Sequence, residues 1–178
     1  MQAFHRHISG KGDGHNLTGP THLATGILIT ASLTSDPKGL AIGMVASLLP
    51  DIDEPGSMIS RKIPIIPYII SLLGHRTITH SLIGLVLFSG FLFVYAKEYL
   101  LVGGVAYLSH LILDTLTPAG VPWFYPLGRN YSLGLFRTGG LTEALYLVLL
   151  FVAGAVWGPV FLKPYMAQLA NLKRMLMF

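Results

Sequence analysis

The sequence contains no cysteine and few charged residues. Without cysteine there is no disulfide, no thiolate nucleophile and no thiolate ligand for a metal ion. Only 11% of the 178 residues are charged, against about 25% in a typical soluble domain, while 52% are hydrophobic. The surface is therefore not built to face water all round, which excludes a disordered protein, a disulfide scaffold and an ordinary nucleic-acid-binding module.

The charges that are present are mainly basic, with a formal net charge of +4 and a mean hydropathy of +0.62. In a membrane protein such an excess is typical of Lys and Arg at the lipid headgroups. We therefore expect a membrane-embedded protein that contacts lipid and binds no nucleic acid. Residues 1–17 are polar and Gly-rich, contain His5, His7 and His15, and are predicted to form a flexible tail.

Beyond the tail, apolar segments alternate with short polar turns. Residues 21–34 and 39–50 flank a turn that contains Asp36, Pro37 and Gly39, which favours a helical hairpin. The alternative is a buried hairpin of a soluble protein. Residues 63–74 are apolar but contain two prolines, so we expect a re-entrant or interfacial segment there.

The remaining apolar segments are longer. Residues 80–100, 100–117 and 141–162 have lengths close to that of a membrane span, and residues 163–178 show the spacing of an amphipathic surface helix. We therefore predict an all-α, polytopic membrane bundle of four to five short hydrophobic helices. Its metal-binding domain would cover residues 18–162, between the tail 1–17 and the surface helix 163–178.

Polar residues of metal-ligand type stand at the ends of these segments. They are His22, Asp51, Asp53, His75, His80, His110 and Asp114. Because each hairpin leaves one side of the membrane and returns to it, all seven are predicted to lie on the same side at similar depth. Imidazole and carboxylate are ligands that suit Zn, Fe or Mn when no thiolate is available.

The spacing of these residues adds detail. His110 and Asp114 are four apart, so they share one helix face, whereas His75 and His80 cannot share one. A tetrahedral zinc takes three or four protein ligands. Seven candidates therefore suit two divalent ions, with zinc favoured and Asp114 bridging them. Taken singly, Asp114 is equally well explained as a helix–helix hydrogen bond, and Asp51 as a cap or an interface charge.

Four motifs carry a family resemblance. THLATG, LLPDID, GHRTITHS and YLSHLILDTLTPAGVPWFYPL, in this order within residues 18–140, resemble the YdjM-type inner-membrane proteins, which are described as membrane-bound metal-dependent hydrolases. The resemblance implies a multi-pass protein of the inner (cytoplasmic) membrane. In the predicted topology seven Lys and Arg residues lie on the metal side and five on the other, which slightly favours a cytoplasmic site.

That family looks distantly similar to zinc-dependent phospholipase C and the S1/P1 nucleases. The similarity implies a ligand set of His22, Asp51 or Asp53, His75 or His80, and the pair His110 and Asp114, whose aspartate bridges two metals. Those relatives have a further His and a later His-x-x-x-Glu, but this chain has no His beyond Asp114. At most two ions are therefore expected.

The first functional hypothesis is a membrane-bound metal-dependent hydrolase that cleaves a phosphoester of a lipid or lipid-linked substrate through a metal-activated water. Asp53 is the expected general base if it is not a ligand, and Arg76 could clamp a phosphate or act as a positive-inside anchor. The rival is a non-catalytic metal protein, such as a sensor, regulator or scaffold. A transporter is disfavoured because the short helices show no evident polar path deep in the bilayer, and the third and last spans carry no charge in their middles.

The long segment 118–140 is rich in Pro and Gly, and loops of this length are often functional. Its Arg129 and Arg137 are interpreted as loop anchors, with headgroup binding as the alternative. Its Trp123, Tyr125 and Tyr131 are interpreted as interfacial aromatic residues, with a substrate cage as the alternative.

Overall fold

The computed structural model describes residues 17–54, 56–62 and 77–176. Residues 1–16 of the predicted tail and the predicted re-entrant segment 63–74 lie outside this part of the chain, whereas Leu17, the last residue assigned to the tail, is buried. The elements in order are α1 (Gly19–Leu33), α2 (Pro37–Ala46), the 3-10 turns η1 (Leu49–Asp53) and η2 (Ser60–Lys62), α4 (Leu82–Tyr95), η3 (Lys97–Tyr99), α5 (Leu100–Thr115) and α6 (Leu141–Leu176). The described residues contain no strand, so the all-α prediction is confirmed.

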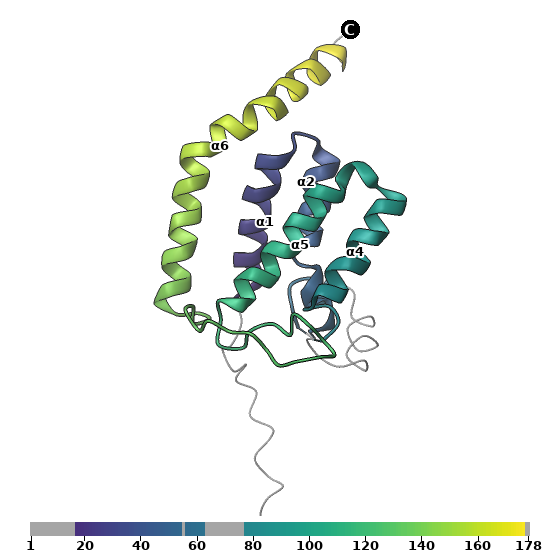
Figure 1. The fold of residues 1–178 in the computed structure, drawn as a ribbon. Coiled ribbons are helices and arrows are strands. Elements are labelled where there is room, and N and C mark those ends of the chain that lie inside the picture. Colours follow the sequence, from purple (N-terminus) through teal and green to yellow (C-terminus); the bar gives the residue numbers. More distant parts are fainter. Residues whose placement is uncertain (1–16, 55, 63–76, 177–178) are drawn as a thin grey trace, which may run out of the picture.

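Helix α5 is the centre of the bundle, with α1, α2 and α4 packed around it (Figure 1). Small residues allow this close packing. An added Cβ at Gly43 would lie 2.2 Å from Thr30 Oγ1, so α2 approaches α1 with no room for a side chain. The apolar core joins Tyr107 and Leu111 of α5 to Val121 of the following loop.

The helix ends follow from local sequence. Asp36 caps α2 by accepting a hydrogen bond from the Lys38 backbone N–H, and Pro37 occupies the first helical position. Tyr99 donates a hydrogen bond to the same carboxylate. This bond lowers the pKa of Asp36 and raises the pKa of Tyr99 to about 12. The pair joins the α1–α2 turn to the α4–α5 turn at one end of the bundle.

One described helix is long and apolar enough to cross a membrane, namely residues Leu141–Val160 within α6. At 1.5 Å per residue, the 14–16 residues of α1, α4 and α5 span only about 21–24 Å, short of a hydrocarbon core of about 30 Å. The structure therefore supports the helical content of the expected bundle of four to five membrane helices. Of its membrane spans, the structure supports one.

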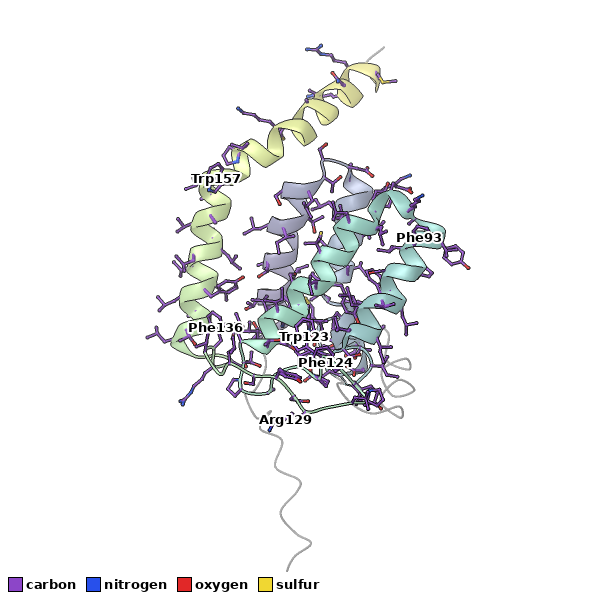
Figure 2. The ribbon with its side chains drawn as sticks, in the orientation of Figure 1. Phe93, Trp123, Phe124, Arg129, Phe136 and Trp157 are labelled. Atoms are coloured by element: carbon purple, nitrogen blue, oxygen red, sulfur yellow. The ribbon has the colours of Figure 1, made fainter. Side chains whose placement is uncertain are left out.

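The C-terminal part of the chain differs from the sequence expectation. We predicted a span that ends at residue 162 and a separate surface helix over 163–178, but α6 is one helix that continues to Leu176. Its first part packs along α1, and after a bend its C-terminal part runs past the end of the bundle at which α1 joins α2 (Figure 1). The bend lies near Trp157 (Figure 2), next to Pro159. A proline inside a helix removes one backbone hydrogen bond and kinks the helix without ending it.

Candidate metal centre

Five of the predicted ligands converge at one end of the bundle, although they come from four separate segments. His22 lies in the first turn of α1, Asp51 in η1, His80 in the turn before α4, and His110 and Asp114 in the last two turns of α5. The relative exposure of these five residues is 8% for Asp51 and at most 1% for the others. The alternation of chain direction along the hairpins therefore brings them to one level, as the sequence predicts.

Four donor atoms form a ring in which nitrogen and oxygen alternate. His80 Nε2 lies 3.5 Å from Asp51 Oδ1 and 3.5 Å from Asp114 Oδ2. His110 Nε2 lies 3.5 Å and 3.6 Å from the same two oxygens. Two imidazoles and two carboxylates thus alternate around this ring, and each contributes one donor atom.

These separations can be compared with the geometry of a zinc site. With Zn–N and Zn–O bonds of about 2.0–2.1 Å, the donors of a tetrahedral ion lie about 3.4 Å apart. The four donor–donor distances in the ring, 3.5–3.6 Å, are within 0.2 Å of that value. The donors that converge on one another form two overlapping sets of three, namely His80, His110 and Asp114, and His22, Asp51 and His110. These buried His and Asp groups could hold a metal ion.

Asp114 extends the cluster beyond this ring. While its Oδ2 faces His80 and His110, its Oδ1 lies 3.2 Å from His22 Nε2. The His22 ring stacks on the His110 ring with their centroids 3.7 Å apart, and His22, Asp51 and His110 form a second group of converging donors. One carboxylate thus serves two sets of imidazoles, which is the arrangement of a bridging ligand.

The orientation of His110 favours metal binding. Its Nδ1 donates a hydrogen bond of 2.8 Å to the backbone carbonyl of Ser47, and a carbonyl oxygen can only accept. Nε2 of His110 therefore points toward the ring of donor atoms. It is buried there and has no hydrogen-bond partner among the described residues. Metal-ligating histidines commonly donate their second nitrogen to a carbonyl in this way, and an orphaned buried nitrogen requires an explanation such as an ion or a water.

His80 is held from its other side. Its Nδ1 lies 3.2 Å from the Thr79 hydroxyl and 3.9 Å from Asp53 Oδ1. Thr79 in turn donates to Asp53 Oδ2 at 2.8 Å, and the Thr79 carbonyl accepts a hydrogen bond from Tyr107. Asp53 therefore stands behind His80, outside both groups of converging donors, where it can orient the imidazole.

The electrostatics also fit a cation. Burial alone would raise the pKa of the Asp51 carboxyl, but the adjacent His110 and His80 imidazoles hold that pKa well below its ordinary value. Asp51 and Asp114 thus place two carboxylates in the protein interior, where an uncompensated charge is costly. A divalent cation held between them would supply compensating positive charge.

Two predicted site residues, His75 and Arg76, lie outside the described part of the chain. The sequence reasoning singled out neither Ser47 nor Thr79. Ser47 contacts His110 through its backbone carbonyl. Every residue type has this group, so the sequence gives no sign of the contact. Thr79 does lie next to His80 in the HRTITH motif, so a search for hydroxyl groups adjacent to candidate ligands could have found it.

Glu143 fixes the first turn of α1, which carries His22. Although it begins an apolar helix, its side chain is buried, with 2% exposure. Its Oε1 accepts hydrogen bonds from the Thr18 backbone N–H at 2.7 Å and from the hydroxyls of Thr18 and Thr21, and its Oε2 accepts from Gly139 N–H at 2.7 Å. This carboxylate therefore ties α6 to the metal-bearing end of α1.

We expect Glu143→Gln to destabilise the protein by about 1–3 kcal/mol, because the amide nitrogen would face a donor in place of an acceptor oxygen and leave it unsatisfied. The unfolding midpoint of detergent-purified protein measures the effect. Glu98→Gln is the matched control, since Glu98 is exposed. Equal midpoints for the two variants would show that the Glu143 hydrogen bonds contribute nothing to stability.

The fold and the site together define a class: an all-α protein with an apolar span and a buried, thiolate-free His/Asp cluster able to hold a metal ion. The family described as "YdjM inner membrane protein" matches residues 17–176. The chain belongs to this family, as the four motifs predicted, and the match supports a location in the inner membrane.

Two relatives illustrate the similarity. The chain is 35% identical over 153 residues to the uncharacterized protein YvsG of Bacillus subtilis (strain 168), covering 79% of this chain and 94% of that protein. It is 32% identical over 126 residues to the inner membrane protein YdjM of Escherichia coli (strain K12), covering 65% of this chain and 64% of that protein. No solved structure matches.

Proposed function

We propose that this protein is a membrane-bound, metal-dependent hydrolase that cleaves a phosphoester of a lipid or lipid-linked substrate. The observation that carries the proposal is the ring of four donors from His80, His110, Asp51 and Asp114, with spacings that suit a small divalent ion. Zinc is the favoured ion because the donors are imidazole and carboxylate and the N–O distances between them are close to those of a zinc site. We further propose that the short helices are embedded as hairpins beside α6.

In this proposal the ring holds one ion. His22 and Asp114 Oδ1 begin a second site, for which His75 is the nearest unassigned candidate in the sequence. Bound metal would supply Lewis-acid stabilisation of the phosphoryl oxygens and acidify a water molecule. The chain's own residues have separate tasks: Ser47 and Asp53 orient the two ring imidazoles, and Asp51 lies at the entrance.

The entrance is inferred from exposure. The side chain of Asp51 is 11% exposed, whereas those of His80, His110 and Asp114 are fully buried. A substrate would therefore reach the ring past Asp51. Arg76, which the sequence places between His75 and the TIT stretch before His80, is the proposed phosphate clamp. Asp53 is assigned a positioning role in place of the general-base role considered from sequence.

One observation favours a second candidate, a non-catalytic metal protein. Three of the four ring residues have a relative exposure of 0%, and structural metal sites are closed whereas catalytic sites keep an open position. A sensor, regulator or scaffold would use such a closed site. The two candidates differ in whether bound metal supports turnover.

The test is elemental analysis of the detergent-purified full chain, carrying His5, His7 and His15 replaced by Ala so that the tail cannot contribute metal. We expect one to two divalent ions per chain, together with a chelator-sensitive release of phosphate or headgroup from lipid phosphoesters. Bound metal without turnover on any lipid phosphoester would favour the closed-site candidate. No metal after resupply would mean that the five residues are a polar packing network.

A further inference from the structure

The loop between α5 and α6 exposes an apolar ridge, defined here as Phe124, Leu127, Tyr131, Leu133 and Leu135. The relative exposures of these residues are 57%, 78%, 45%, 64% and 61%. Single exposed hydrophobic side chains are ordinary, but a contiguous group marks an interaction site. Figure 2 shows Phe124 and Arg129 on this loop, beyond the end of the bundle that carries the His/Asp cluster.

The exposure is built into the loop. Backbone N–H groups of Tyr131, Leu133 and Leu135 donate to the carbonyls of Val121, Thr115 and Leu116. The Ser132 hydroxyl donates inward to the Thr117 carbonyl. Gly134 has a positive φ of 63°, so this segment is not a regular strand. The clamped backbone nevertheless leaves the side chains of Tyr131, Leu133 and Leu135 exposed.

Aromatic and polar contacts fix the other side of the loop. Phe124 packs edge-on against Tyr131, with 5.7 Å between ring centroids. The Trp123 indole N–H donates to the Thr115 hydroxyl at 3.0 Å. Trp123 is thus engaged with the end of α5, whereas Phe124 and Tyr131 are the exposed aromatic residues of the ridge.

The position of the ridge indicates what covers it. The candidate span of α6 begins at Leu141, six residues after Leu135, and its first outward side chains, Leu141 and Leu145, are 76% and 54% exposed. The ridge therefore continues the lipid-facing surface of α6 at the level where that helix enters the membrane. Apolar and aromatic side chains at this level are typical of the membrane–water interface.

The charges near the ridge also indicate contact with the membrane interface. Arg129, which lies between Leu127 and Tyr131 in the sequence, and Arg137, which follows Leu135, are both exposed. Neither has a carboxylate partner in an ion pair among residues 77–176. Guanidinium groups bind phosphate through paired hydrogen bonds, and basic residues next to apolar anchors strengthen binding to anionic lipid. Apolar side chains near arginines fit the membrane interface, because the apolar groups can contact the ends of the lipid acyl chains nearest the headgroups. The arginines can contact the lipid phosphates above them.

We propose that the apolar ridge docks into the membrane interface, with Arg129 and Arg137 on the phosphates of anionic lipid headgroups. The loop is fixed to Thr115, Leu116 and Thr117, which directly follow Asp114. Docking therefore brings the headgroup layer to the end of α5 that bears the His/Asp cluster. This inference does not depend on hydrolysis or on a bound metal.

The absence of cysteine makes the test direct, because a single Cys can be introduced and labelled with an environment-sensitive fluorophore. Leu127→Cys and Leu133→Cys report on the ridge, and Val148→Cys, on an outward position of α6 with 58% exposure, reports on lipid contact within the span. The labelled full chains are reconstituted into phosphatidylcholine vesicles with and without phosphatidylglycerol.

At both ridge positions we expect loss of quenching by iodide and strong quenching by lipids brominated near the glycerol backbone. At Val148 we expect quenching by lipids brominated near the chain ends. Free quenching of the ridge labels by iodide would mean that the ridge faces water. Shielding from both quenchers would mean that protein covers it, as a second copy of the chain would. Either result overturns the proposal.

A second arm tests the arginines. In Arg129→Gln/Arg137→Gln, lipid quenching at Leu127 is expected to fall in vesicles that contain phosphatidylglycerol and to stay unchanged in phosphatidylcholine alone. An unchanged signal in both vesicles would overturn the headgroup assignment. Metal content is measured in the same samples. Failure of the metal-dependent hydrolase proposal would leave these quenching results unaltered.

Discussion

Asp114→Asn is expected to reduce metal affinity more than any other single substitution in the chain. Its Oδ1 lies 3.2 Å from His22 Nε2, and its Oδ2 lies 3.5–3.6 Å from His80 and His110. The amide keeps the shape of the carboxylate but loses its charge and one of its two acceptor oxygens. Because changes in the outer shell of a metal site already cost about 10–100-fold in affinity, we expect a loss of at least about 100-fold.

The measurement is the metal content of purified protein across a series of free zinc concentrations. Asp36→Asn is the matched control, since Asp36 caps α2 at the opposite end of the bundle and should leave the metal content unchanged. His22→Ala is the comparison that tests the bridging role. If His22→Ala loses more metal than Asp114→Asn, then Asp114 does not bridge two sets of ligands.

Gly26→Ala is expected to destabilise the protein, although alanine is the better helix former. In an open helix the substitution would contribute up to about 1 kcal/mol. At position 26, however, the new Cβ would lie 2.4 Å from both Cβ and Oγ of Ser47. Overpacking of this kind costs about 1–3 kcal/mol, and Cβ of Ser47 cannot rotate away. The unfolding midpoint should therefore fall.

The same substitution at Gly90 is the matched control. Gly90 lies inside α4, and an added Cβ there meets nothing within 4 Å, so Gly90→Ala should raise the midpoint. The double variant Gly26→Ala/Ser47→Gly removes the obstructing side chain and should recover most of the loss. A higher midpoint for Gly26→Ala alone would show that α1 and α2 separate freely at this contact.

The Gly26 contact is also linked to the site. The carbonyl that orients His110 belongs to Ser47, the residue against which Gly26 packs. A displacement of Ser47 would rotate the His110 imidazole and move Nε2 out of the ring. We therefore expect Gly26→Ala to lower metal affinity as well as stability, and Gly90→Ala to leave metal affinity unchanged.

The sequence predicted the helical class, the hairpin order and the common end of the bundle. Apolar runs broken by Pro, Gly and Asp indicate where most of the helices lie, and an antiparallel order fixes which ends meet. His22, Asp51, His80, His110 and Asp114 accordingly converge. The sequence did not predict that α6 continues past residue 162 as one bent helix. Pro159 and Pro164 are as compatible with the end of a helix as with a kink inside one.

Residue identity and spacing thus determined by themselves which chemistry can assemble, namely imidazoles and carboxylates without thiolates, and at which end of the bundle. Only the tertiary structure decided which atoms face one another. It placed Asp51 in the donor ring and Asp53, two residues later, behind His80, and it oriented His110 by means of the carbonyl of Ser47, which directly follows α2. These choices depend on side-chain rotamers and on small differences in the distances between helices. Both arise from contacts between segments far apart in the chain and have no signature in local sequence.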